Sequence, residues 1–113
     1  MNLLDRIKAR RAELNPDGET YLPPRGCDSL TAKEEQLARD HELERAEEAL
    51  KHIQDEERAM AWLCQRLQEA RRTREIYSNT MQYSTLLEQC ERCLELRKLI
   101  EDAGGVVPPQ VHQ

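Results

Sequence analysis

The residues best suited to chemistry in this 113-residue chain are four cysteines and three histidines. Cys90 and Cys93 lie three residues apart, so on a helix their thiolates could share one side and bind zinc. The other two ligands of a four-ligand site would be Cys27 or Cys64, and His41 or His52. Structural zinc sites usually have a second closely spaced ligand pair, which this sequence lacks. Cys90 and Cys93 also lie among apolar residues, where a free cysteine behaves as a small hydrophobe. We therefore favour two core cysteines over a zinc site, and expect no cofactor.

The sequence also lacks the motifs of familiar catalytic sites. A redox Cys-x-x-Cys pair begins a helix after a strand, whereas Cys90-x-x-Cys93 falls in the middle of an expected helix. No Ser-His-Asp set, zinc-protease motif or glycine-rich phosphate loop is present. The acidic residues have the spacing of a solvated helix surface. We predict that the protein is not an enzyme.

Two basic clusters are candidate contacts for an anionic partner. Either cluster could hold phosphate groups or an acidic protein surface. The net charge of −5, however, does not favour a nucleic-acid partner. No aromatic side chains alternate with the basic residues to stack on bases. A small nucleic-acid-associated regulator therefore stays an alternative. The clusters are Arg6, Lys8, Arg10 and Arg11, and Arg71, Arg72 and Arg74.

Composition predicts one all-α domain. Charged residues make up 35% of the chain and aromatic residues only 4%, a balance typical of long helices that meet along narrow apolar seams. No stretch approaches the roughly 20 apolar residues of a membrane span. The N-terminus is too polar for a secretory signal. We expect a cytoplasmic protein, or one of the host cytoplasm or virion if the chain is viral, with reduced cysteines.

Proline and glycine residues divide the chain. They gather between Pro16 and Gly26 and return only at Gly104, so the window between is expected to be helical. Asn15-Pro16-Asp17-Gly18 predicts a turn. Capping boxes are predicted at Thr31–Glu34 and Thr85–Glu88, with a glycine cap at Gly104. The predicted elements are a short helix 1–14, a loop 15–28, a long helix 29–77, a turn 78–84, a helix 85–103 and a tail 104–113. Helices 29–77 and 85–103 would form a coiled-coil-like helical hairpin, with one kinked continuous helix as the alternative.

An apolar seam runs along the predicted long helix. Leu43, Ala46, Leu50, Ile53, Glu57, Met60, Cys64 and Leu67 follow the alternating 3-4 spacing of a packed helix. That helix would span ~72 Å and the C-terminal helix only ~28 Å, at ~1.5 Å per residue. The seam would therefore be only partly covered by Leu86, Leu87, Cys90, Leu94 and Ile100. We predict that a second copy covers the rest, through Leu43, Leu50, Ile53, Met60, Trp62, Leu63 and Leu67. Trp62 fits a core anchor and an interface equally well.

The sequence therefore favours a non-enzymatic, helical protein–protein interaction or assembly protein that acts as a homo-oligomer. The proline-bearing segments near Leu22 and Val107 would make peripheral contacts. A viral, phage or bacterial assembly, or a small inhibitor of a host protein, would suit such a chain. No membrane partner is expected.

Overall fold

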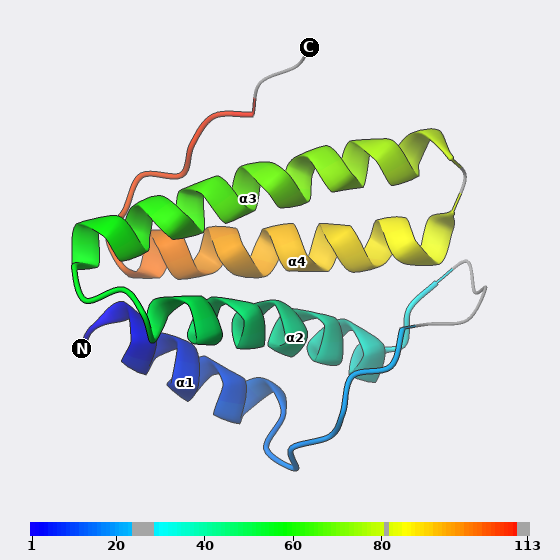
Figure 1. Ribbon diagram of the computed structural model, residues 1–113. Coiled ribbons are helices and arrows are strands. Elements are labelled where there is room, and N and C mark those ends of the chain that lie inside the picture. The colour runs from blue at the N-terminus through cyan, green and yellow to red at the C-terminus, as the bar shows by residue number, and fades with distance from the viewer. Residues whose placement is uncertain (24–28, 81, 111–113) are drawn as a thin grey trace.

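The computed structural model describes residues 1–23, 29–80 and 82–110, and the protein is all-α over these residues. Figure 1 shows the helices in chain order. They are α1 (Leu3–Leu14), α2 (Ala32–Leu50), α3 (Glu56–Asn79) and α4 (Tyr83–Asp102). Among the described helices, none is both long and apolar enough to cross a membrane.

Local hydrogen bonds explain how α1 begins and ends. The Asn2 side chain accepts a hydrogen bond from the Asp5 backbone N–H at 2.8 Å, which caps the first turn. The predicted turn after α1 is confirmed: the Gly18 N–H donates to the Asn15 carbonyl at 3.2 Å, and Gly18 has a φ of 67°. Few residues other than glycine adopt that backbone conformation easily. The Asn15 side chain also bonds both backbone groups of Glu19, at 2.8 and 2.9 Å.

The predicted single helix 29–77 is wrong. The capping box of Thr31 and Glu34 is present at the start of α2, but that helix ends at Leu50. α3 begins afresh at Glu56, where the Asp55 side chain accepts from the Glu57 N–H at 2.8 Å. An aspartate cap followed by acidic residues is a helix start that needs no glycine or proline before it.

The predicted second capping box, at Thr85–Glu88, is also wrong. α4 already begins at Tyr83, and its N-cap residue Gln82 makes no capping bond through its side chain. The Glu88 carboxylate instead accepts from Arg92, at 2.8 and 3.1 Å. α3 and α4 are two separate helices rather than one kinked helix.

The predicted glycine cap after α4 is confirmed. The Gly104 N–H donates to the Glu101 carbonyl at 3.0 Å and the Gly105 N–H to the Ile100 carbonyl at 2.9 Å, a Schellman motif. Gly104 has a φ of 80°. A Cβ on Gly105 would lie 2.7 Å from the Met60 sulfur, so α3 and the end of α4 pack closely here.

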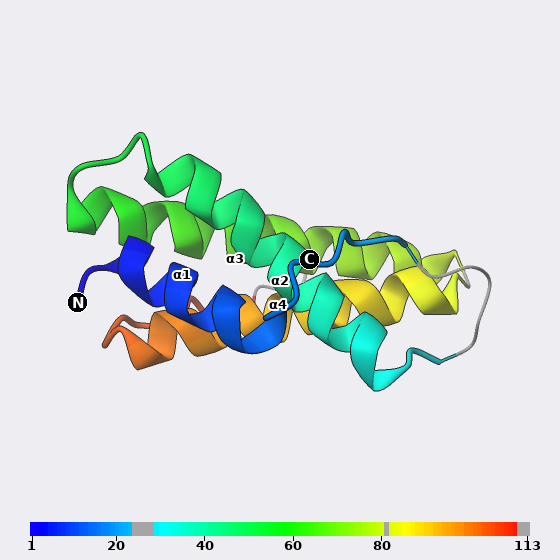
Figure 2. The same cartoon turned by 90° about the horizontal axis from the view of Figure 1, so that it is seen from below.

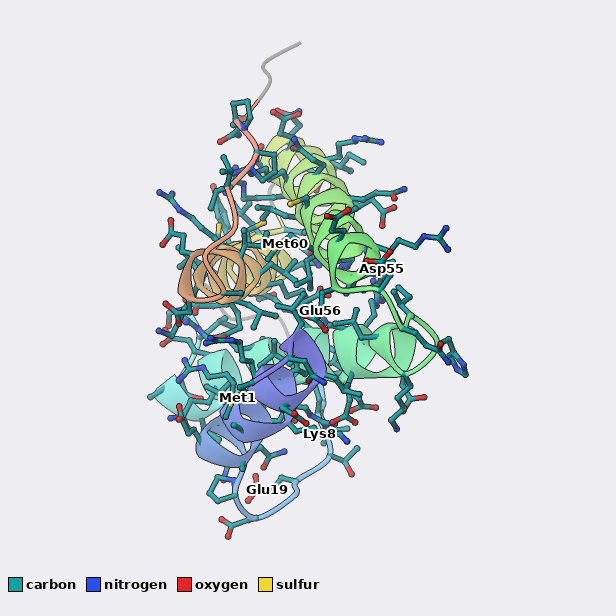
Figure 3. All side chains as sticks on the ribbon, turned by 90° about the vertical axis from the view of Figure 1, so that its left-hand side faces the viewer. Met1, Lys8, Glu19, Asp55, Glu56 and Met60 are labelled. Atoms are coloured by element: carbon teal, nitrogen blue, oxygen red, sulfur yellow. The ribbon has the colours of Figure 1, made fainter. Side chains whose placement is uncertain are left out.

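The four helices form two layers. α3 and α4 lie antiparallel and side by side, and α1 and α2 lie together beneath them (Figure 1). α2 crosses the α3–α4 layer obliquely (Figure 2). At the end of the molecule viewed in Figure 3, Glu56 of α3 lies near the start of α1, where its carboxylate accepts from the Leu3 N–H at 3.2 Å.

A small aliphatic core lies between the layers. Every helix contributes to it, and Ile7, Leu43, Leu63, Leu67, Leu96 and Ile100 are its largest fully buried apolar residues. The break between α2 and α3 makes this core possible. It places the first part of the predicted seam on α2 and the second part on α3, and both parts pack into the same core as residues of α1 and α4. The chain thus covers that seam itself.

Candidate functional site

Charged side chains are buried between the two layers. Glu42 of α2, which is fully buried, accepts from Arg66 of α3 at 2.7 and 2.9 Å and from Arg92 of α4 at 3.3 Å. Arg92 also donates to Glu88. We call these four residues the ionic layer. Buried charges are tolerated when they are paired and hydrogen-bonded in this way, so the ionic layer joins α2, α3 and α4 in one arrangement.

An aromatic pair closes one end of the ionic layer. Tyr21 and His41 stack with their ring centroids 4.8 Å apart, and the Arg92 guanidinium carbon lies 5.7 Å from the Tyr21 ring centroid. Arg92 Nη2 lies 2.7 Å from His41 Nδ1. Arginine can only donate, so Nδ1 is the acceptor and the imidazole proton is on Nε2.

The environment holds both aromatic groups neutral. Burial lowers the pKa of His41 below its ordinary 6.5, and the positive charge of Arg92 lowers this pKa further. Burial also raises the pKa of Tyr21, and the nearby Glu88 carboxylate raises it further. The Tyr21 hydroxyl is buried without a hydrogen-bond partner among the residues that the structure describes. We interpret the pair as packing rather than as a proton-transfer site.

The basic cluster of α1 is largely used for internal ion pairs. Arg10 donates to the buried Glu95 at 3.0 and 3.1 Å. Arg11 donates to the buried Asp40 at 2.8 Å and to Glu47 at 3.3 Å. These contacts hold α1 against α4 and α2.

The second basic cluster is also divided. Arg71 donates to the Pro108 carbonyl at 2.7 Å and so holds the C-terminal segment against α3. Arg72 is exposed and Arg74 is half-buried. In α1, Lys8 is exposed and Arg6 half-buried. α1 lies in the lower layer and α3 in the upper layer (Figure 1), and the two helices contact each other where Leu3 meets Glu56, near the first residues of both and many residues before Arg71. The two clusters therefore do not form one basic surface.

A polar cleft of about 570 Å³ lies between α1, residues 15–21 and α2. Lys8 and Glu19, labelled in Figure 3, are part of its lining. Its buried carboxylate, Asp40, is already bound by Arg11 and, at 3.2 Å, by the Asn15 amide. The buried carboxylate of this cleft is therefore already paired.

The three cysteines that the structure describes are free thiols. Cys93 is buried, as predicted, and burial raises its pKa. Cys90, which was also predicted to lie in the core, is only half-buried. Cys64 is half-buried as well, and its thiol lies 3.9 Å from the Val106 carbonyl oxygen. Within the described residues no three His, Cys, Asp or Glu side chains cluster as metal ligands would. Cys27 lies outside the described residues.

The predicted interface residues do not form an open surface. Leu43, Leu50, Leu63 and Leu67 are buried in the core of the monomer. Ile53, Met60 and Trp62 are half-buried and pack against that core. The predicted long helix, too long for the C-terminal helix to cover, does not exist, because α2 and α3 are separate helices packed in different layers.

The residues expected to cover that seam mostly lie elsewhere as well. Ile100 is buried, but Leu94 is 50% exposed, while Leu86, Leu87 and Cys90 are half-buried. Tyr83, which was not among the expected residues, is 49% exposed. At 100° per residue, Tyr83, Leu87, Cys90 and Leu94 share one side of α4, opposite the buried Glu88, Arg92, Leu96 and Leu99. We call these four residues, Tyr83, Leu87, Cys90 and Leu94, the outer face of α4.

The outer face has the 4-3-4 spacing of a helix-packing seam, which sequence reasoning assigned to α2 and α3 instead. α4 has apolar residues on two sides. Cys93, Leu96 and Ile100 are buried in the core, and the outer face lies on the solvent side. A helix that is apolar on more than its core-facing side can indicate a second packing partner. No protein-family model, curated protein or solved structure matches the chain.

Proposed function

We propose that this chain is a non-enzymatic helical interaction protein that assembles as a homo-oligomer through the outer face of α4. The observation that carries the proposal is the row Tyr83, Leu87, Cys90 and Leu94, an apolar seam on the solvent side of a helix. Apolar residues gathered in such a row favour association, because burying them removes apolar surface from water.

The other strongly exposed apolar residues in the described part of the chain do not form a comparable row. They are Met1, Leu22, Ile76 and Val106, each on a different segment. Single exposed apolar residues are ordinary features of protein surfaces. The outer face is therefore the surface best suited to a protein partner.

The nucleic-acid alternative has less support. Arg10, Arg11 and Arg71 are held by internal contacts. The remaining basic residues of the two clusters lie on helices of different layers, α1 and α3. We favour a role as a viral, phage or bacterial assembly component, or as an inhibitor of a host protein, in the cytoplasm.

Sedimentation velocity over a wide concentration range tests self-association. One helix face of this length buries less than the roughly 1,200 Å² of a stable interface, so we expect a dissociation constant in the micromolar range or above. Leu94 is half exposed, so burying the rest of its side chain contributes about 1 kcal/mol in each copy. Leu94→Ser should therefore cost about 2 kcal/mol per symmetric dimer, or a roughly 30-fold rise in the dissociation constant.

Ile76→Ser is the matched control, since Ile76 is an exposed apolar helix residue outside this face. It should leave the dissociation constant unchanged. A chain that stays monomeric at every concentration would refute the proposal. So would a dimer that Ile76→Ser weakens more than Leu94→Ser does.

A further inference from the structure

We infer that Tyr21 and His41 form a pH-sensitive switch, in which protonation of His41 releases Tyr21 and the residues beside it from the helices. This switch is independent of self-association through the outer face of α4. The segment that it controls, residues 16–23, follows α1 and borders the polar cleft. Tyr21 is the one residue of this segment that is not exposed, so its ring is what packs the segment against the helices.

Tyr21 is held through its ring. The ring stacks on the His41 imidazole, with the two planes inclined by 22°, and the Arg92 guanidinium also lies over it. The Tyr21 hydroxyl adds no hydrogen bond within the described part of the chain. Among the described residues, the hydrogen bonds and ion pairs of the segment end at Glu19, which is bound by Asn15 and Lys33. Loss of the stack would therefore free residues 20–23.

The hydrogen bond between Arg92 and His41 makes the stack sensitive to protonation. Arg92 Nη2 lies 2.7 Å from His41 Nδ1, and a guanidinium can only donate, so the bond exists only while Nδ1 is unprotonated. Protonation removes the acceptor and places a second positive charge against the guanidinium. Arg92 is buried and bound to Glu88 and Glu42, so it cannot easily withdraw. His41 is half-buried and lines the cleft, so the imidazolium is the group that moves.

The other charges near His41 come from α2, α1 and the segment itself. On α2, Glu42 is already bound by two arginines, and Arg45 adds a positive charge that lowers the pKa of His41. Glu44 is 56% exposed, lines the cleft and raises this pKa, so it attracts an imidazolium toward the cleft. The remaining charged groups of the cleft wall are Lys8 and Arg11 of α1, Glu19 of the segment, and Asp40 and Glu47 of α2.

The switch opens in acid. Burial lowers the pKa of His41 below its ordinary 6.5 in the packed form, and the charge of Arg92 lowers it further. In the released form the imidazole lies in water, where its ordinary pKa returns. The released form therefore binds a proton more tightly, and its population grows as the pH falls below 6.5. Down to the pKa of the packed form, the ratio of released to packed molecules rises by at most about tenfold for each pH unit.

An NMR titration of the full chain from about pH 8 to about pH 5, the range in which histidines titrate, tests the switch. The stacked imidazole shifts the ring resonances of Tyr21. These resonances should move to unstacked positions with the same midpoint as the His41 signals, and nuclear Overhauser contacts between the two rings should disappear. Tyr77 of α3 and Tyr83 of α4 are internal controls whose resonances should not follow this midpoint.

Three variants assign the effect to the switch. His41→Gln keeps an acceptor for Arg92 but cannot titrate, so Tyr21 should stay packed across the whole range. Tyr21→Leu removes the stack, so the midpoint of His41 should rise toward 6.5. His52→Gln, at an exposed histidine beyond the end of α2, is the matched control and should change neither result.

Tyr21 that keeps its contacts to His41 throughout the titration of His41 would overturn the switch. Release of Tyr21 at the same pH in His41→Gln would overturn it too, because another group would then be responsible. The same conclusion would follow if His41 stayed neutral until the whole chain unfolds, or if Tyr21 were released only together with the loss of helical circular dichroism.

Discussion

Removing the carboxylate of Glu42 should destabilise the fold strongly. Glu42 is fully buried and accepts three hydrogen bonds from Arg66 and Arg92. Glu42→Ala leaves Arg66 buried with only a 3.6 Å contact to the half-exposed Glu69. Breaking one partner of a buried ion pair typically costs about 3–5 kcal/mol, because the other charge stays out of water without compensation.

Urea unfolding followed by circular dichroism measures this loss. With a slope of about 2 kcal/mol per molar urea, typical for a small domain, the unfolding midpoint should fall by about 2 M. Glu101→Ala is the matched control. It also removes a glutamate paired with an arginine, but the Arg97 and Glu101 side chains are 59% and 51% exposed. A pair of that kind contributes less than about 1 kcal/mol.

A double variant separates charge from packing. Glu42→Met with Arg66→Met removes both charges and keeps apolar bulk, while Arg92 keeps its bonds to Glu88. Replacing a buried ion pair by apolar residues is often neutral or stabilising, so the double variant should recover most of the lost stability. If Glu42→Ala costs no more than Glu101→Ala, water must reach the ionic layer, and our reasoning about it is wrong.

Two further outcomes follow from the same structure. Because burial lowers the pKa of His41 in the folded protein, the unfolded chain binds more protons below pH 6.5, and stability should fall as the pH drops from 6.5 through the folded-state pKa. His41→Gln keeps an acceptor for Arg92 but cannot titrate, so urea midpoints should depend less on pH in this range; an unchanged dependence would contradict this account. Arg71→Ala should release the C-terminal segment and speed alkylation of Cys64 several-fold, as peptide mapping by mass spectrometry would show. Arg72→Ala is its exposed control, and equal rates in the two variants would argue against a restraining role for Arg71.

Local structure was predictable wherever short-range hydrogen bonds determine it. The Asn15–Gly18 turn, the Thr31–Glu34 capping box and the Gly104 cap each depend on residues within a few positions of one another, and all three are present. The end of α2 was missed because no proline or glycine marks it. Asp55 followed by two glutamates was the available signal, but the apolar spacing across residues 43–67 outweighed it.

The ionic layer could not be predicted because its partners are distant in sequence. Glu42 lies 24 residues from Arg66 and 50 from Arg92. In the sequence these residues look like the charged surface of a helix, since glutamate and arginine are rarely buried unless they are paired. Only the fold brings them together, and the same is true of Arg10 and Glu95, which are 85 residues apart.

The ionic layer and the outer face are properties of opposite sides of one helix. On its inner side, α4 presents Glu88 and Arg92 to Glu42 of α2, and a shift of α4 by one residue would leave these charges unpaired in the core. We therefore expect α4 to hold one position, which also fixes Tyr83, Leu87, Cys90 and Leu94 relative to the rest of the molecule. A face held rigidly before binding loses less conformational entropy on association. For a surface as small as this one, that saving contributes to whether two copies associate at micromolar concentration.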